Sequence, residues 1–190
     1  GSNKNLTKLD ITSSSKVQIF LDKLFRSDEK VTIINCTGLS INTYLHKSDE
    51  KLWIKTIETN LIGSYNIYKH SLSHMRKVGN GTIINLSSIV GQIAVQGTSA
   101  YSASKSALDG LTRTAACENA SKDITINNIA LGYFDRGLIN QVPKEARNNL
   151  LNSIPKKRFG HPSEIVQTIL FMEKNRYLTG STINLNGGLF

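Results

Sequence analysis

Short apolar runs rich in β-branched residues alternate along this chain with longer stretches that carry apolar residues at helical spacing. This alternation predicts an α/β fold, because helices that connect neighbouring strands cover both faces of a mostly parallel sheet. The predicted strands cover residues 6–11, 31–35, 82–87, 124–131 and 181–185. The predicted helices cover residues 14–26, 48–75, 98 or 101 to 120, and 162–173, with a further short helix that begins at Pro143.

The length of 190 residues favours one domain, residues 1–190, over two. Hydrophobic residues make up 39% of the chain and the mean hydropathy is −0.21, which is typical of a globular protein. No apolar run approaches the roughly 18 residues of a membrane-spanning helix, and the first residues do not resemble a secretion signal. We therefore expect a cytoplasmic protein with no membrane partner.

The net charge of +9 raises the question of a nucleic-acid partner. The lysines and arginines are scattered, however, and their densest cluster, Lys156-Lys157-Arg158, is not interleaved with aromatic residues. We therefore expect no nucleic-acid partner. Two explanations of the positive charge remain: solvated faces, or a docking surface for an acidic or phosphorylated substrate carrier.

Cys36 and Cys117 suggest neither a disulfide framework nor a metal-ligand pair, and their apolar, small neighbours predict buried free thiols. The four histidines are dispersed. His70 and His74 could share a helix face, but no acidic residue or third nitrogen ligand follows them. We therefore expect no metal site.

Tyr101 and Lys105 stand four residues apart in a predicted helix, so their side chains lie on the same face. A lysine ammonium beside a tyrosine favours the phenolate, and we expect it to lower the pKa of the phenol. A phenol tuned in this way suits the task of giving a proton to a carbonyl oxygen.

Ser88 directly follows the predicted strand 82–87. A hydroxyl at the carboxyl end of a strand lies where open α/β sheets bind ligands. There it can hydrogen-bond a reacting oxygen and help to stabilise developing charge. Further upstream, Asn60 places an amide side chain inside the predicted helix 48–75.

Together these residues resemble, in type, order and spacing, the catalytic tetrad of the short-chain dehydrogenase/reductase family: Asn60, Ser88, Tyr101 and Lys105. The resemblance implies a Rossmann-like, doubly wound, mostly parallel sheet. It implies that Tyr101 is the general acid/base, and that Lys105 tunes the pKa of Tyr101 and binds the nicotinamide ribose. It also implies that Ser88 orients the substrate and that Asn60 holds a water that feeds a proton relay.

Flanking residues resemble the family as well. The Ile-Asn-Cys-Thr-Gly segment that contains Asn35 and Gly38 resembles the family's Asn-Asn-Ala-Gly segment, which implies cofactor contacts for both residues; a role in a turn alone is the other interpretation. Asp10 matches a family position near the adenine ring, and a helix-capping role is equally compatible with the sequence. Residues 160–165 and 178–188 resemble the family's carboxyl-terminal blocks.

The sequence departs from the family at its amino-terminal end. No Gly-x-x-x-Gly-x-Gly segment precedes residue 6, so the turn that receives the cofactor pyrophosphate is absent together with the first βαβ unit. In the family's sheet, the absent first strand separates the strands that match 6–11 and 31–35. We therefore expect residues 31–35 to form an exposed hydrophobic edge, and the chain to be an N-terminally truncated fragment.

Further departures lie at the nicotinamide end of the resemblance. Gly132 follows a leucine where the family usually has Pro-Gly, and Arg136 aligns with a threonine that usually contacts the carboxamide. Both are candidate cofactor-binding residues. Arg136 could bind the cofactor phosphates or a substrate carboxylate, or fill a site that no longer binds cofactor. Residues 132–159 form a long polar segment, which we expect to act as a substrate lid.

The leading hypothesis is an oxidoreductase that exchanges hydride between NAD or NADP and a small-molecule carbonyl or alcohol substrate, free or carrier-bound. The strongest subfamily resemblance is to 3-oxoacyl-carrier-protein reductases; polyketide, sugar and surface-polysaccharide reductases resemble the chain almost as well. The alternatives are a cofactor-free, non-catalytic subunit and an inactive truncated fragment with impaired cofactor binding.

The choice between NAD and NADP depends on residues after the absent second strand. The helices predicted from residues 48 and 101 resemble the family's dimer-forming pair, so we expect a homodimer or homotetramer.

Overall fold

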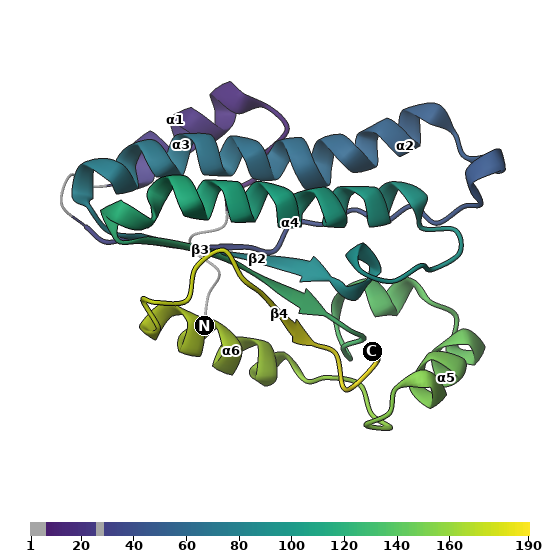
Figure 1. The fold of residues 1–190 in the computed structure, drawn as a ribbon. Coiled ribbons are helices and arrows are strands. Elements are labelled where there is room, and N and C mark those ends of the chain that lie inside the picture. The colour runs from purple at the N-terminus through teal and green to yellow at the C-terminus, as the bar shows by residue number, and fades with distance from the viewer. Residues whose placement is uncertain (1–6, 26–28) are drawn as a thin grey trace.

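The structure is a computed structural model that describes residues 7–25 and 29–190. Its centre is a sheet in which all neighbouring strands are parallel and the strand order follows the chain (Figure 1). The strands are β1 (Thr32–Asn35), β2 (Gly81–Ser88), β3 (Ile124–Leu131) and β4 (Thr182–Leu185). This confirms the predicted α/β class with a Rossmann-like parallel sheet.

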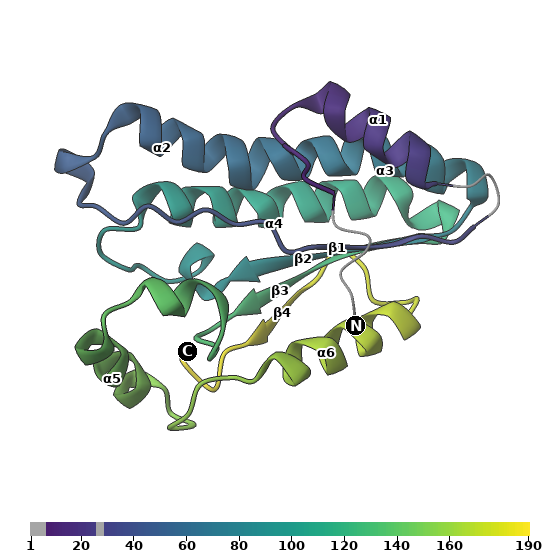
Figure 2. The same ribbon diagram turned by 180° about the vertical axis from the view of Figure 1, so that it is seen from behind.

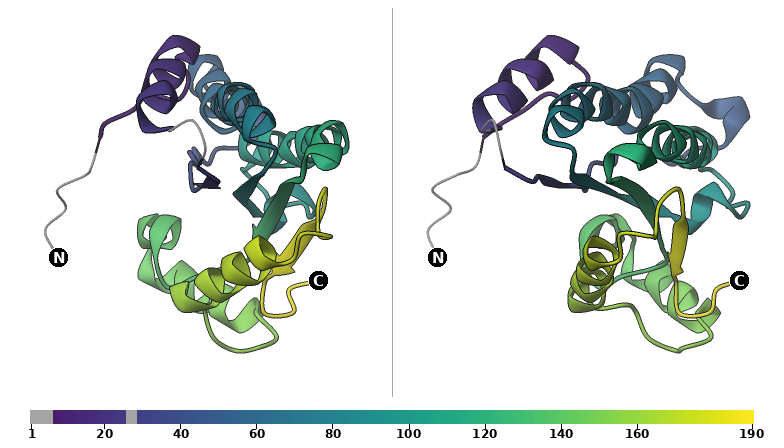
Figure 3. Two further views of the ribbon diagram at one scale, coloured as in Figure 1. Left: turned by 90° about the vertical axis from the view of Figure 1, so that its left-hand side faces the viewer. Right: turned by 60° about the vertical axis from the view of Figure 1, so that its left-hand side comes forward.

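Helices lie on both faces of the sheet, as the crossover connections between parallel strands require (Figures 2 and 3). One face carries two long helical segments. The first consists of α2 (Glu50–Ile57), a π-helical turn (Glu58–Ile62) and α3 (Gly63–Val78). The second, beside it, is α4 (Ser99–Asn119). The other face carries α6 (Pro162–Lys174).

Two further helices lie at the periphery. α1 (Ser14–Leu24) packs against α3 on the outside of the first helix layer. α5 (Lys144–Ser153) begins directly after Pro143, as predicted, and lies beyond the carboxyl ends of the strands. The segment predicted as a lid, 132–159, therefore stands next to the end of the sheet where ligands bind in open α/β folds.

Successive strand residues point to opposite faces, which gives the protein two cores. On one face, Ile83 of β2 and Ile126 of β3 pack in the core beneath α3 and α4. On the other, Ile84 of β2 packs with Met172 of α6. All four side chains are fully buried. Burial on both faces is why the apolar residues of β2 and β3 do not alternate with exposed polar ones.

β1 is an edge strand, as predicted. It pairs with β2 from Thr32↔Thr82 to Asn35↔Asn85, and no strand within 7–25 or 29–190 pairs with its other side. Ile33 and Ile34 are only partly buried.

Two local predictions at the amino-terminal end are wrong. Residues 7–11, predicted as part of a strand, form a loop and turn instead, because a lone extended segment gains no stability without a neighbouring strand; Leu6 lies outside the described residues. The helix predicted over 14–26 ends at Leu24, and Arg26 lies outside the described residues.

Asp49 caps α2, which begins at Glu50, two residues after the predicted start of this helix at residue 48. An Asp49 carboxylate oxygen accepts a hydrogen bond from the Leu52 amide at 3.0 Å, which satisfies one of the free donors of the first turn. The Ser48 hydroxyl instead donates to the Leu45 carbonyl at 2.8 Å, in the preceding short turn.

Both cysteines are free but exposed, so the predicted burial is wrong. Cys117 follows Ala115 and Ala116, which take the buried positions of α4. The next residue is rotated away from the core by the helical period. Cys36 lies in the loop after β1, where the path of the backbone, and not the apolar character of the side chain, determines how exposed the thiol is.

No helix in the described residues is both long enough and apolar enough to cross a membrane. The same part of the chain brings no three His, Cys, Asp or Glu side chains into one metal-binding group.

The Arg176 guanidinium joins the amino ends of β2 and β3. It donates to the Thr82 hydroxyl at 2.7 Å, the Thr125 hydroxyl at 3.2 Å and the Gly81 carbonyl at 3.1 Å, and it forms an ion pair with Asp123 at 3.2 Å. Thr82 and Thr125 are almost fully buried.

We therefore expect Arg176→Ala to lower the free energy of unfolding by about 2 kcal/mol, because it removes hydrogen bonds from the buried Thr82 and Thr125 hydroxyls and from the Gly81 carbonyl. Urea denaturation followed by circular dichroism measures this. Arg113→Ala, at an exposed position of α4, is the control and should stay within about 0.5 kcal/mol of wild type. Equal effects of the two changes would show that Arg176 is not a structural clamp.

Candidate active site

Tyr101 and Lys105 lie in the first two turns of α4, the end of the helix nearest the carboxyl ends of the strands (Figure 1). The Lys105 side chain is only 2% exposed. Its ammonium donates a hydrogen bond of 2.8 Å to the Leu86 carbonyl of β2, and its nitrogen stands 5.7 Å from the centre of the Tyr101 ring. The two side chains thus share one face of the helix, as the spacing predicted.

Ser88 is the last residue of β2. Its hydroxyl accepts a hydrogen bond of 3.2 Å from the Val90 amide, which orients it at the start of the loop. The same hydroxyl hydrogen-bonds the Tyr101 phenol and acts to lower its pKa. The structure therefore brings Ser88, Tyr101 and Lys105 together at one end of the sheet.

The predicted acidity of the Tyr101 phenol is wrong for this structure. Burial raises the pKa of Tyr101, and the hydrogen bond with Ser88 offsets only part of that rise. Burial also lowers the pKa of Lys105 from 10.5 to about 8, so desolvation affects both members of the pair. At neutral pH the phenol is protonated and the lysine is charged, which is the protonation state that a proton donor to a carbonyl oxygen needs.

Asn60 lies within the π-helical turn and is 1% exposed. Its amide nitrogen donates to the Leu39 carbonyl and to the Ser104 hydroxyl, both at 2.9 Å, and its amide oxygen accepts from the Leu39 amide at 2.7 Å. Asn60 thereby ties the loop after β1 to α4, next to Lys105. Single π-helical turns inside longer helices often mark functional sites, and the sequence pattern does not indicate this one.

Asn35 and Gly38 approach the same place from β1. Asn35 is buried, and its amide oxygen accepts from the Thr37 amide at 3.2 Å and from the Thr37 hydroxyl at 2.6 Å. This turn brings Gly38 to the Lys105 ammonium: a Cβ on Gly38 would lie 3.9 Å from that nitrogen. Both proposed roles, in the turn and beside the cofactor site, agree with this position.

Asp10 has local contacts, away from the tetrad. Its carboxylate accepts from the Thr12 amide at 3.1 Å and the Thr12 hydroxyl at 2.7 Å, and these bonds lower the pKa of Asp10. Lys16 lies 4.0 Å from the carboxylate. These contacts fit the predicted role at the start of a helix, since they shape the turn that leads into α1.

Gly132 and Arg136 lie after β3. A Cβ on Gly132 would come within 2.7 Å of the Asn186 Cα atom, so glycine is required there by the close approach of the segment after β4. Arg136 is exposed and precedes the short 3-10 helix Gly137–Gln141.

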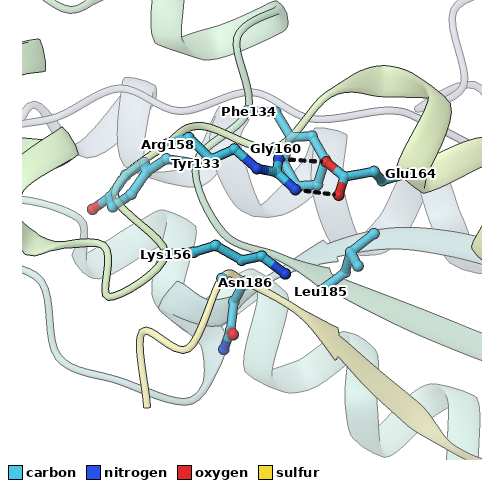
Figure 4. Close-up of a pocket in the computed structure, with 9 residues that line it drawn as sticks. Tyr133, Phe134, Lys156, Arg158, Gly160, Glu164, Leu185 and Asn186 are labelled. Atoms are coloured by element: carbon cyan, nitrogen blue, oxygen red, sulfur yellow. Dashed lines mark hydrogen bonds and ion pairs between the residues drawn. The ribbon is translucent and has the colours of Figure 1, made fainter.

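A small cavity of about 90 Å³ lies at the carboxyl ends of β3 and β4 (Figure 4). Arg158 borders it and forms a two-pronged ion pair with Glu164, at 2.7 and 2.8 Å, which lowers the pKa of Glu164 to about 2. The side chain of Lys156 points into the cavity. Arg158 is therefore committed to a partner within the chain, and the Lys157 ammonium likewise donates to the Asn152 carbonyl at 2.8 Å.

Sequence reasoning missed a set of buried asparagines near the site. Asn85 and Asn128 are fully buried in neighbouring strands, and Asp109 stands one helical turn after Lys105. A signal existed: asparagine inside an otherwise apolar central strand is rarely buried without hydrogen-bond partners.

Comparison with known proteins agrees with this geometry. Residues 1–190 match the sequence model of a family described as enoyl-acyl-carrier-protein reductase. The 3-oxoacyl-acyl-carrier-protein reductase of Thermotoga maritima is 33% identical over 184 residues, which are 95% of this chain and 75% of that protein. The chain belongs to the short-chain dehydrogenase/reductase family. The members of this family are NAD(P)-dependent oxidoreductases, and the match confirms the resemblance seen in the sequence.

Two further relatives carry the same name. The protein of Staphylococcus epidermidis is 37% identical over 160 residues, or 83% of this chain and 66% of the relative. The protein of Pseudomonas aeruginosa is 32% identical over 185 residues, or 96% of this chain and 75% of the relative. The chain thus spans about two thirds to three quarters of the length of these relatives.

Proposed function

We propose that this chain reduces a carbonyl group, or oxidises the corresponding alcohol, by hydride exchange with NADH or NADPH. The observation that carries the proposal is the meeting of Ser88, protonated Tyr101 and the buried Lys105 ammonium at the carboxyl end of β2. Burying an ammonium group lowers the stability of the fold. A protein that only binds a partner has no need of such a buried charge, whereas a catalytic site does.

The bound cofactor would supply the hydride to the carbonyl carbon. Tyr101 would give its phenolic proton to the carbonyl oxygen, so that one hydride and one proton convert the carbonyl to an alcohol. Ser88 would donate a hydrogen bond to the same oxygen and stabilise its developing charge. Asn60 would hold the water through which the Tyr101 phenolate regains its proton.

Lys105 fits the nicotinamide ribose. An ammonium has three donors, and in the described residues it makes a single hydrogen bond, to the Leu86 carbonyl. The two remaining donors suit the ribose hydroxyls. Asn35 and Gly38 would line the cofactor beside Lys105. Gly132 would lie at the carboxamide of the cofactor. Arg136 would bind a cofactor phosphate or a substrate carboxylate, and Asp10 would lie near the adenine.

The relatives support a 3-oxoacyl substrate on an acyl carrier, since this is what their shared name specifies. The chain's net charge of +9 suits an acidic carrier. Residues 132–159, with α5, would act as the lid over the acyl group. The free thiols agree with a reducing compartment, the cytoplasm.

One observation favours a second function. Arg136 stands where the family usually has a threonine that contacts the cofactor carboxamide. A cofactor-free subunit that keeps the fold for assembly is therefore the alternative. It predicts no turnover in the wild-type chain, so that a change of Tyr101 has no effect on activity.

Tyr101→Phe should reduce turnover by a factor of about 10² to 10⁴, because it removes only the transferable proton. Oxidation of NADPH or NADH with acetoacetyl-coenzyme A, followed by absorbance, measures this in the full chain. Tyr177→Phe, at a position 99% exposed, is the control and should keep wild-type turnover. Full activity in Tyr101→Phe would refute the proton-donor role, and no turnover in wild type would favour the alternatives.

We also propose a homodimer or homotetramer formed through the long helices. Ile54, Ile62 and Tyr65 are 43%, 42% and 44% exposed. They fall on one stripe of the α2–α3 segment, because their spacings of eight and three residues follow the helical period. An apolar stripe of this kind suits a self-complementary contact between two copies.

Sedimentation velocity tests this assembly. Wild type should sediment as a dimer or tetramer, and Ile62→Lys combined with Tyr65→Lys should sediment as a monomer. Leu24→Lys on α1, where the side chain is 58% exposed, is the control and should leave the assembly unchanged. A monodisperse wild-type monomer would contradict the proposal.

A further inference from the structure

Three asparagines form a continuous ladder across the sheet. Asn35 of β1, Asn85 of β2 and Asn128 of β3 stand in register with one another. The Asn35 amide nitrogen donates to the Asn85 oxygen at 3.2 Å, and the Asn85 nitrogen donates to the Asn128 oxygen at 2.8 Å. All three are almost fully buried.

The ladder ends on a carboxylate of α4. The Asn128 amide nitrogen donates to Asp109 at 2.7 Å, and the Thr182 hydroxyl donates to the same oxygen at 3.1 Å. A carboxylate can only accept, so it forces Asn128 to present its nitrogen to α4 and its oxygen to Asn85. The same constraint passes to Asn85 and Asn35, and the three amides point the same way.

The other end of the ladder reaches the tetrad. Asn35 also donates to the Ser64 hydroxyl at 2.9 Å, and that hydroxyl donates to the Asn60 carbonyl at 2.7 Å. The Asp109 charge thus fixes a hydrogen-bonded chain that runs beneath the site from α4 to the π-helical turn. Chains of aligned hydrogen bonds in a buried setting reinforce one another.

Asp109 also lies four residues after Lys105 on α4, the spacing at which helical side chains are neighbours. The other groups that face Lys105 are Tyr101 on the same helix, the Leu86 carbonyl on β2 and the Cys36 thiol after β1. Although Cys36 is exposed, partial desolvation by its neighbours raises the pKa of its thiol, and burial raises the pKa of Tyr101, so both groups are neutral at neutral pH. Among these groups, Asp109 is the one that carries a negative charge.

We propose that Asp109 is a positioning residue that acts through Lys105: its carboxylate, fixed by Asn128 and Thr182, is the counter-charge that keeps the buried ammonium protonated. The inference rests on the proposed function, since a charged Lys105 is what the ribose and the proton donor require. It adds a residue outside the tetrad to the machinery, and it gives the buried ladder a purpose beyond packing.

The direction of the effect follows from the sign of the charges. Burial favours the neutral amine, whereas a Cys36 thiolate and, to a smaller extent, the Asp109 carboxylate favour the ammonium. Because Cys36 is neutral at neutral pH, Asp109 is the one of the two that supplies the charge there. Loss of the carboxylate charge therefore shifts the deprotonation of Lys105 to lower pH. Asp109→Asn removes the charge while its amide oxygen can still accept from Asn128 and Thr182, so the ladder keeps its direction.

The test is the titration of the Lys105 side chain in the full chain, followed by nuclear magnetic resonance with labelled lysine and assigned with Lys105→Arg. Asp109→Asn should move the titration midpoint to lower pH. Asp109→Glu should stay near wild type, and so should the control Asp22→Asn on α1. An unchanged midpoint in Asp109→Asn would overturn the proposal, even if thermal unfolding showed that the variant is less stable.

This readout needs no catalysis, so it separates the two proposals. A shifted titration midpoint of Lys105 in Asp109→Asn, together with no turnover in wild type, would support the role of Asp109 and contradict the proposed reaction. With turnover, the alkaline limb of kcat against pH should move to lower pH in Asp109→Asn by the same amount as the midpoint. A limb that stays in place would contradict the claim that Asp109 acts through Lys105.

Discussion

The site depends on one buried contact, the hydrogen bond between the Lys105 ammonium and the Leu86 carbonyl. It joins α4 to β2 at the level where the strands end, and it holds a charge in a place that water does not reach. Because a buried charge is unfavourable without partners, the neighbouring groups must be arranged around it. The need to stabilise this buried charge explains why Tyr101, the loop after β1 and the Asp109 carboxylate are placed around Lys105.

The parallel sheet makes this arrangement possible. Every strand ends at the same edge, so the loop after β1, Ser88 and the residues after β3 lie close together although they are distant in the sequence. The asparagine ladder lies one layer below and links the strands sideways with side-chain hydrogen bonds. A polar network of this kind is stable only when each member has a partner, and the Asp109 carboxylate supplies the last acceptor.

Much of this could be read from the sequence. The apolar runs gave β2 and β3 nearly to the residue, and the Tyr101–Lys105 spacing gave the shared helix face, because both depend on local periodicity. What depends on tertiary neighbours could not be read. The strand expected before α1 lacks a partner, and the pKa of the Tyr101 phenol rises because desolvation exceeds the effect of the hydrogen bond with Ser88. Cys117 is exposed because helix rotation, not residue type, sets its direction.

The central claim is that the unused donors of Lys105 face the ribose of a nicotinamide cofactor. Fluorescence titration of the full chain with NADH and with NADPH tests it most directly, in wild type and in Lys105→Met. The account predicts saturable binding of at least one of the two, weakened by about tenfold or more when the charged donor is lost. No binding up to millimolar cofactor, or equal binding by wild type and the variant, would contradict it.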